Sequence, residues 1–198
     1  MLVKGHRATV DDMELIESLR LLAEQHMSGL SFLAAYGVTW LVCGVIWLRA
    51  SSRTAAFVTL FQGMVALPAA LALSAAIGAL GGDRPVTDEI TQLSVLIGTS
   101  QLLGLPFLIY LTVRRRYALV PFAFAGITSM HFVLYSWLYQ TPVYIVMAVL
   151  ISLGAMIVML AVPEKAEDRL GPARVSLLTG GLLLATALFF LISHLSGR

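Results

Sequence analysis

Residues 143–162 read VYIVMAVLISLGAMIVMLAV and contain no charged side chain. A helix rises about 1.5 Å per residue, so a run of about 20 apolar residues crosses the roughly 30 Å hydrocarbon core of a bilayer. The stretch PEKAED follows directly at residues 163–168, and its proline and charges mark the end of the run. This stretch therefore predicts a transmembrane helix and sets the fold class of the chain.

Five further apolar runs of similar length accompany it. The six runs comprise residues 30–48, 55–80, 93–113, 117–138, 143–162 and 175–195. The chain of 198 residues is 59% hydrophobic and 12% charged, with a mean hydropathy of +0.88, far above the range of a soluble domain. We expect an all-α, polytopic membrane bundle in which residues 29–198 form six transmembrane helices and residues 1–28 an amphipathic helix.

Residues 9–27, TVDDMELIESLRLLAEQHM, have the pattern of that amphipathic helix. The apolar side of the helical wheel holds Leu15, Ile16, Leu19, Leu22 and Ala23, and the polar side holds Glu14, Glu17, Ser18 and Gln25. Five acids against one arginine exclude attraction to anionic headgroups as its role. We expect it to lie on the membrane surface or to cover the spans as a lid, with residues 10–27 as the contact for a protein partner.

Lysine and arginine are unequally divided between the two sides of the membrane. Eight lie after the first, third and fifth spans, namely Arg49, Arg53, Arg114, Arg115, Arg116, Lys165, Arg169 and Arg174. The opposite side has five, namely Lys4, Arg7, Arg20, Arg84 and Arg198. The positive-inside rule therefore predicts that both termini lie outside the cytoplasm.

Polarity inside the spans is uncharged. The 11 acidic residues all lie outside or at the edge of the predicted spans, so the buried acid common in proton-coupled carriers is missing. Gln62 and Gln101 stand out, each a few residues before Pro68 or Pro106. A proline frees a backbone carbonyl and bends its helix. The two bent helices and their amides either line a cavity or tie helices together.

Small or polar residues recur along two spans. They are Gln62, Ala66, Ala70, Ser74 and Gly78 in the second span, and Thr179, Thr186 and Ser193 in the sixth. Such stripes allow helices to approach closely in lipid, so they predict a tightly packed bundle and leave a homo-oligomer open. The single cysteine, Cys43, is interpreted as a small filler between helices.

Residues 128–140, TSMHFVLYSWLYQ, carry a polar and aromatic stripe. At about 100° per residue, Thr128, His131, Tyr135 and Tyr139 share one face, which we expect to point into the bundle. Trp137 points elsewhere and is typical of an interfacial anchor, as is Trp47 at the other side, whereas Tyr139 fits either role. The candidate cavity-lining residues are Gln62, Gln101, Thr128, His131 and Tyr135.

Three histidines, His26, His131 and His194, fall near the outer side. Imidazoles bind metals and titrate near neutrality, but these match no metal motif and have no acid beside them within a span. No metal, cofactor or catalytic residue is therefore assigned. GxSxG, HExxH and phosphate-loop motifs are absent, which counts against an enzyme. The one basic run, RRR at residues 114–116, is explained by topology, so nucleic acid is not an expected partner.

Two functions remain open at this point. The first is a small channel or transporter for a neutral or weakly charged solute, with the five candidate residues along its path. The second is a non-transporting membrane module that senses or binds a partner through its outer helix. An intramembrane enzyme is the third alternative.

The stretch HFVLYSWLYQTPVYIVMA at residues 131–148 resembles a family of small six-helix bacterial integral membrane proteins with no established activity. The positions that carry the resemblance are His131, Phe132, Tyr135, Trp137, Tyr139, Thr141, Tyr144, Met147 and Ala148, joined by GLSFLAAYGVTW at residues 29–40. The resemblance implies the six-helix fold and a place in the bacterial inner membrane. It implies no substrate.

The predicted orientation can be tested with cysteines introduced into two connections. Gly82→Cys should react with a membrane-impermeant maleimide added to intact cells, because the second connection is predicted to be external. Ser51→Cys should react only after the cells are opened. Labelling of Ser51→Cys but not Gly82→Cys in intact cells would reverse the orientation.

Overall fold

The computed structural model describes residues 4–79, 88–162 and 169–196, and it shows only helices there. The α-helices are α1 (Lys4–Gln25), α2 (Leu30–Arg49), α3 (Ser52–Phe61), α4 (Gly63–Ala76), α5 (Asp88–Ser100), α6 (Leu105–Val113), α7 (Leu119–Leu138), α8 (Val143–Ala161) and α9 (Leu170–Ser196). Two short 3-10 helices join some of them, η1 (Met27–Gly29) between α1 and α2, and η2 (Gln101–Gly104) between α5 and α6.

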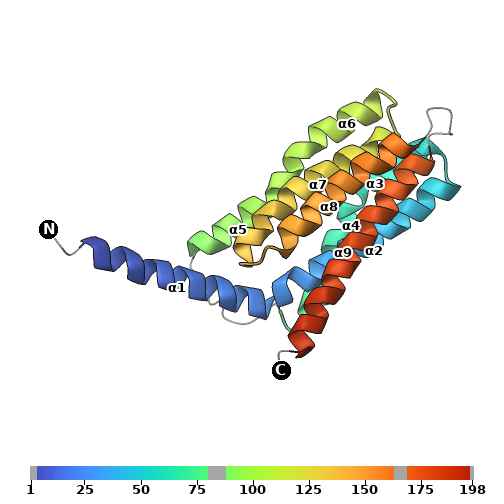
Figure 1. The fold of residues 1–198 in the computed structure, drawn as a ribbon. Coiled ribbons are helices and arrows are strands. Elements are labelled where there is room, and N and C mark those ends of the chain that lie inside the picture. The colour runs from blue at the N-terminus through green and yellow to red at the C-terminus, as the bar shows by residue number, and fades with distance from the viewer. Residues whose placement is uncertain (1–3, 80–87, 163–168, 197–198) are drawn as a thin grey trace.

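Six helical segments of the described chain are long and apolar enough to cross a membrane. They are Met27–Arg49, Ser52–Ala76, Ile90–Val113, Leu119–Leu138, Val143–Ala161 and Leu170–Ser196. The six-helix fold predicted from the sequence is therefore confirmed, and these helices indicate a multi-pass membrane protein. They run side by side, while α1 leaves the bundle at an angle, at the end where the C-terminus lies (Figure 1).

Two helix ends differ most from the sequence prediction. The second span ends at Ala76, four residues early, because Gly78 has a left-handed φ of 74° and the amides of Gly78 and Ala79 cap the carbonyls of Ala75 and Ser74. Gly78 therefore ends the helix and is not part of a packing stripe. The sixth span begins at Leu170, five residues early, because Arg174 is exposed and its charge does not interrupt the helix.

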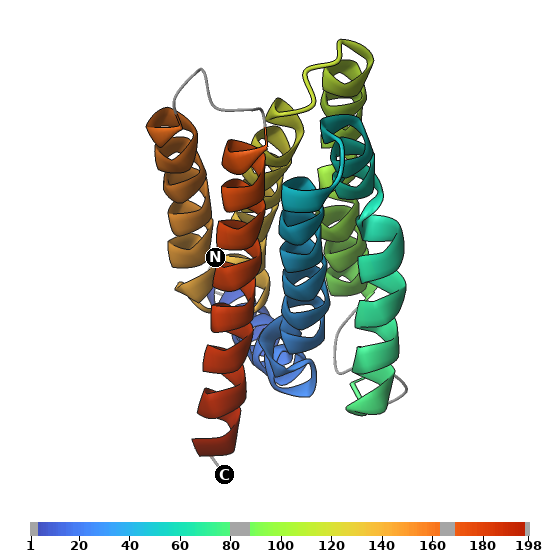
Figure 2. The same ribbon diagram turned by 90° about the vertical axis from the view of Figure 1, so that its right-hand side faces the viewer.

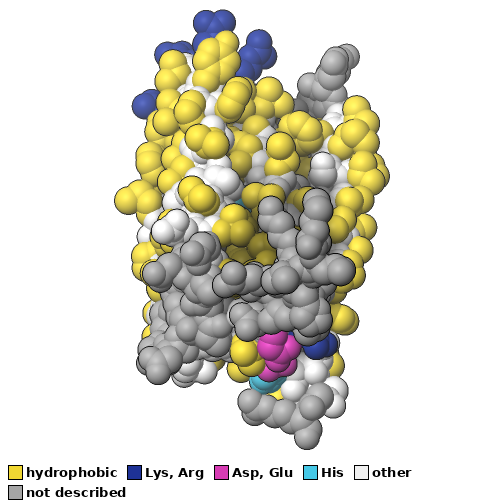
Figure 3. All heavy atoms as spheres, turned by 90° about the vertical axis from the view of Figure 1, so that its left-hand side faces the viewer, with side chains coloured by type: hydrophobic (Ala, Val, Ile, Leu, Met, Phe, Trp, Pro, Cys, Tyr) yellow, Lys and Arg dark blue, Asp and Glu magenta, His cyan; other side chains and the backbone are white. Residues whose placement is uncertain are grey.

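The arginines of the odd-numbered connections gather at one end of the bundle. The C-terminal end of α2, the start of α3, the end of α6 and the start of α9 meet there, and Lys and Arg side chains crown this end in Figure 3. The opposite end holds α1 and the connection between α7 and α8. We call these the arginine end and the α1 end.

Glycines bring α2 and α9 into backbone contact. A Cβ on Gly180 would lie 2.8 Å from the carbonyl oxygen of Gly37 and 2.8 Å from the backbone nitrogen of Leu41. Two turns after Gly37 on α2, a Cβ on Gly44 would lie 2.7 Å from the side chain of Leu177 on α9. The two helices therefore lie side by side along most of their length (Figure 2). In lipid, where apolar side chains gain little by leaving the solvent, such close approach is a main source of helix association.

The small-residue stripe of the second span packs against another helix of the same chain. Ala66, Ala70 and Ser74 are buried, and α4 packs against α2. The helix is interrupted at Gln62, six residues before Pro68, and η2 likewise precedes Pro106. Both prolines are thus accompanied by the expected irregularity of their helices. Thr179 and Thr186 of the sixth span are buried as well, whereas Ser193 is exposed.

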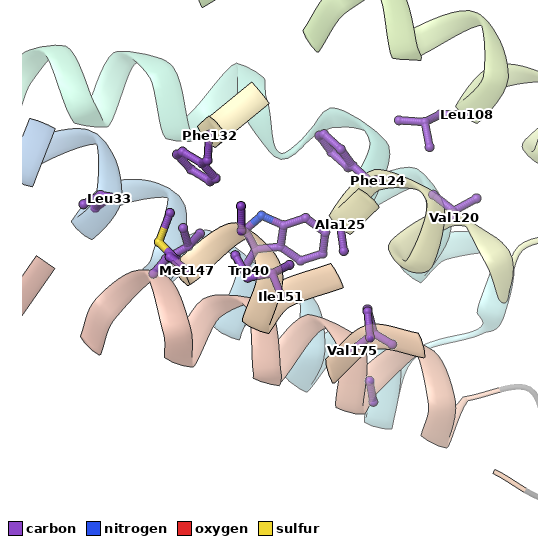
Figure 4. Close-up of a cluster of buried hydrophobic side chains, with 14 of the residues drawn as sticks. Leu33, Trp40, Leu108, Val120, Phe124, Ala125, Phe132, Met147, Ile151 and Val175 are labelled. Atoms are coloured by element: carbon purple, nitrogen blue, oxygen red, sulfur yellow. The ribbon is translucent and has the colours of Figure 1, made fainter. Parts of the chain in front are cut away.

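A packed hydrophobic core lies between the helices and reaches the arginine end. Trp40 of α2 lies at its centre, with its ring centroid 5.4 Å from that of Phe124, and side chains from α7 and α8 surround it (Figure 4). Trp47 is also fully buried, and its indole N–H donates a 3.0 Å hydrogen bond to the hydroxyl of Thr59. The expectation that Trp47 is an interfacial anchor was wrong, because the buried hydroxyl of α3 partners its N–H inside the protein.

Neighbouring glycines of α9 provide a matched test of the α2–α9 contact. Gly180→Ala should lower the free energy of unfolding by about 1–3 kcal/mol, because the added methyl meets backbone atoms that cannot rotate away. Gly181→Ala should leave it unchanged or slightly raised, since a Cβ there meets no atom within 4 Å. Unfolding of the purified protein in mixed micelles, followed by circular dichroism, measures both. Equal stability of the two variants would contradict the close contact.

Candidate functional site

A cavity of about 500 Å³ lies in the half of the bundle toward the α1 end. Its wall is formed by Leu22, His26, Gly29, Phe32, Leu33, Tyr36, Leu67, Thr91, Ser94, Val95, Gly98, Thr99, Gln101, Thr128, His131, Phe132, Tyr135, Leu138, Tyr139 and Tyr144. Most of these residues come from α1, α2, α4, α5, α7 and α8, while Gly29 lies on η1, Gln101 on η2, and His26 and Tyr139 just beyond the ends of α1 and α7. The volume is within the range of about 300–1,000 Å³ that is usual for small-molecule sites.

The structure brings four of the five candidate residues together around this cavity. Gln101 lies on η2, and Thr128, His131 and Tyr135 lie on one face of α7. Tyr36 of α2 lines the same cavity as Gln101. The sequence hypothesis about the stripe of the fourth span is compatible with this placement.

Gln62 lies elsewhere and is not part of the wall. It is only 4% exposed and accepts a 3.5 Å contact from the thiol of Cys43, between α2 and the start of α4. Its amide nitrogen has no partner among the described residues. The physical reason is its position on the buried stripe of small residues that packs against α2, which turns the side chain away from the cavity.

His131 is held by a neighbouring helix. The hydroxyl of Ser100 donates its one hydrogen to the carbonyl of Ile97 at 2.7 Å, and it lies 3.0 Å from Nδ1 of His131. The Ser100 hydroxyl therefore joins the imidazole of His131 to the backbone of α5. The ring also belongs to the cavity wall.

Aromatic rings form a continuous surface beside His131. The ring of Tyr135 meets His131 edge-on at 4.9 Å and stacks with Tyr139 at 5.7 Å, and Tyr139 stacks with Tyr144 at 5.8 Å. Burial raises the pKa of Tyr139, and the neighbouring Tyr135 adds to this, so the phenol is neutral at physiological pH. Tyr139 thus belongs to the cavity wall, whereas Trp137 is exposed on another face of α7.

The last turns of α1 cover the cavity. Leu19 and Leu22 are buried in a small cluster with Ile90, Ile97 and Leu138, which come from α5 and α7. Leu22 and His26 reach the cavity wall. These residues pack on the bundle beside the cavity, and we call this part of α1 the lid; Leu15, Ile16 and Leu21 remain exposed.

The junction between the lid and α2 has an unusual backbone. Met27, Ser28 and Gly29 have positive φ values of 44°, 49° and 80°. The hydroxyl of Tyr144 donates a hydrogen bond to the carbonyl of Ser28, and a Cβ on Gly29 would lie 2.7 Å from that hydroxyl. Two consecutive non-glycine residues in the left-handed region are costly, so the tertiary contact with α8 holds this turn in place.

The cavity offers hydrogen-bonding groups but no described charge. The hydroxyls of Ser94 and Thr99 donate to carbonyls of their own helix and keep lone pairs as acceptors. Thr128 is only 4% exposed, and its hydroxyl makes no hydrogen bond with the described residues. The described wall includes no Asp, Glu, Lys or Arg. A bound molecule is therefore met by aromatic faces and neutral hydrogen-bonding groups.

Histidines do not assemble a metal site in the described part of the chain. His26 and His131 both lie in the cavity wall, but His194 does not. No group of three His, Cys, Asp or Glu side chains suited to a metal ion is found among the residues that the structure describes.

Several wall residues were not singled out from the sequence. Phe32 and Tyr36 repeat at a spacing of four in the first span, and Ser94 and Gly98 do so in the third. The spacing places each pair on one helix face, but nothing in the sequence tells an inward face from a lipid-facing one when both are apolar. Tyr144 was noted only for the family resemblance, and its role depends on the carbonyl of Ser28, 116 residues away.

The fold is that of a small multi-pass helical membrane protein, and its cavity is confined to the half of the bundle toward the α1 end. The chain belongs to DUF7010, a family of unknown function whose pattern matches residues 16–193. The match covers the first five spans, the sixth as far as Ser193, and the residues Leu19, Leu22 and His26. No curated protein of known function and no solved structure matches the chain.

Removing the Tyr144 hydroxyl tests the junction. Tyr144→Phe should destabilise the lid by about 1–3 kcal/mol, because the Ser28 carbonyl loses its hydrogen-bond partner. Amide hydrogen exchange over residues 15–30 should become faster, with the rest of the bundle unchanged. Tyr110→Phe is the matched control, since Tyr110 is exposed on α6. Unchanged exchange in Tyr144→Phe would show that the lid does not depend on this bond.

Proposed function

We propose that this protein is a carrier that binds a neutral small molecule, or the neutral part of a larger one, in the cavity and moves it across the membrane. The observation that carries the proposal is a cavity of about 500 Å³ with polar groups at membrane depth and no charged residue in its described wall. A polar side chain inside a membrane is costly unless it forms hydrogen bonds. This cost favours a ligand that bonds to Thr128, His131 and Gln101.

A carrier fits the shape of the cavity better than a channel does. The cavity occupies the half of the bundle toward the α1 end, and the packed core around Trp40 and Phe124 fills the other half. A channel needs a continuous path, whereas a carrier exposes its site to one side at a time. The interruptions at Gln62 and η2 lie in helices on two sides of the cavity, and they supply places where the helices can bend.

Neutrality of the ligand follows from the wall. A charged group transferred from water into this site would find no opposite charge among the described residues, and its desolvation would not be offset. A hydroxyl or amide would find hydrogen-bond partners in the side chains of Thr128, Gln101 and His131. The aromatic faces of Tyr135 and Tyr139 suit the flat or apolar parts of such a molecule.

The proposal includes the setting of the protein. We place it in the bacterial inner membrane, with the arginine end in the cytoplasm and both termini outside, as the positive-inside rule predicts. In this orientation the cavity lies in the outer half of the bundle, where Leu22 of α1 belongs to its wall.

Two glycines make a matched test of transport. A Cβ on Gly98 in the cavity wall, or on Gly181 on the exposed face of α9, meets no atom within 4 Å. Gly98→Leu should therefore fill part of the cavity without straining the fold, and Gly181→Leu should leave the cavity as it is. Proteoliposomes are assayed for transport of glycerol, glucose, uridine and a fluorescent glucosyl-diacylglycerol.

At least one of the four compounds should cross faster with wild-type protein and with Gly181→Leu than in protein-free vesicles. Gly98→Leu should return that rate to the protein-free value. If no compound in the panel crosses faster with wild-type protein, or if Gly98→Leu transports as well as wild type, the carrier proposal is wrong.

A further inference from the structure

The cavity has an opening on the side of the bundle that would face lipid. Among the described residues, α4 packs on α2 and α3, and α5 packs on α7 and η2, but α4 and α5 do not pack against each other along their lengths. Leu67 of α4 and Val95 of α5 both belong to the cavity wall, yet they are 45% and 59% exposed. These two side chains therefore border a gap that joins the cavity to the outer surface.

The surroundings of this gap are apolar. Met64 and Val65, within one turn of Leu67 on α4, are strongly exposed. An opening within the hydrophobic band of a membrane protein leads into the bilayer and not into water.

The polar groups of the cavity lie inward from the gap, near the middle of the spans. Gln101 falls close to the centre of the span Ile90–Val113, and Thr128 close to the centre of Leu119–Leu138. Thr128 is nearly fully buried with an unpartnered hydroxyl, and it belongs to the wall. Two chemically distinct regions thus adjoin, an apolar gap open to lipid and a neutral polar site at mid-membrane depth.

We infer that the ligand is a membrane lipid with an uncharged, hydroxyl-bearing head, and that it reaches the cavity sideways between α4 and α5. Its head is held by Thr128, His131 and Gln101, while its chains stay in the bilayer and pass through the gap between Leu67 and Val95. This inference rests on the proposed carrier function and names its substrate class.

The physical reason lies in the barrier that such a lipid meets. A head with several hydroxyls must lose its hydrogen bonds to water when it enters hydrocarbon, whereas its chains need no transfer at all. A site that supplies hydrogen-bond partners to the head lowers that barrier. Because the chains pass through the gap and stay in the bilayer, the cavity has to hold only the head. A charged head would lose more hydration and find no counter-charge in the described wall.

The test measures movement of lipids between leaflets of proteoliposomes. The probe is glucosyl-diacylglycerol with a fluorescent acyl chain, and dithionite added outside bleaches only the molecules in the outer leaflet. Phosphatidylglycerol with the same labelled chain is the anionic control. Wild-type protein should make the inner-leaflet glucosyl lipid accessible to dithionite, and the phosphatidylglycerol probe should stay protected.

Variants at the gap separate the sideways path from the cavity itself. Val95→Trp should slow movement of the glucosyl lipid at least about tenfold, because the larger ring closes the gap to the head. Leu96→Trp is the matched control, since Leu96 is exposed on the same helix but does not line the cavity. Leu67→Trp narrows the gap from the other side and should act as Val95→Trp does. Thr128→Val should slow movement about three- to tenfold through loss of one hydrogen bond.

The outcomes distinguish this inference from the carrier proposal. If Gly98→Leu blocks movement of the glucosyl lipid but Val95→Trp and Leu67→Trp do not, the sideways path is wrong and the cavity remains a carrier site. If glucose or uridine crosses and the glucosyl lipid does not, the substrate class is wrong and the carrier function stands. Equal movement of phosphatidylglycerol overturns the requirement for an uncharged head. Transport of none of these compounds overturns both proposals.

Discussion

The backbones of α2 and α9 touch at Gly37 and Gly180, and the arrangement of the other helices depends on this contact. Within a bilayer, apolar side chains find the same surroundings in lipid as in protein, so helices associate where their shapes allow close approach. With α2 fixed on α9, the opposite side of α2 is free to receive the stripe of Ala66, Ala70 and Ser74 on α4. The helices α7 and α8 then pack on α9 and complete a compact half-bundle.

The cavity exists because this packing leaves α4 and α5 without contact along their lengths. The helices α4 and α5 are held by different neighbours, so no contact draws them together along their lengths. Large aromatic rings around Trp40 fill the space toward the arginine end, where Phe124 meets Trp40. Toward the α1 end, aromatic rings such as Tyr135 and Tyr139 stand around an open space, and Leu22 of the lid borders it.

The candidate site was partly accessible to sequence reasoning. Thr128, His131 and Tyr135 recur at helical spacing in an apolar run, and a polar stripe of that kind has reason to avoid lipid, so its inward direction could be predicted. Gln62 shows the limit of the same reasoning. It is as polar as Gln101 and also precedes a proline, yet it packs against Cys43 while Gln101 lines the cavity. Trp47 is a second example, because a tryptophan near a span end is typical of the interface, and only the Thr59 hydroxyl explains its burial.

The sequence by itself determined the number of spans, their approximate ends, the segregation of arginine to one end and the amphipathic character of α1. These properties follow from the composition of contiguous segments, because the cost of placing charge in hydrocarbon acts on each segment separately. Only the tertiary structure decided which face of a helix meets protein and which meets lipid, since both faces are apolar. It also decided the pairing of Gly37 with Gly180, the bond from Tyr144 to Ser28 and the gap between α4 and α5. Each of these joins residues far apart in the chain, and their meeting depends on the packing of all the helices at once.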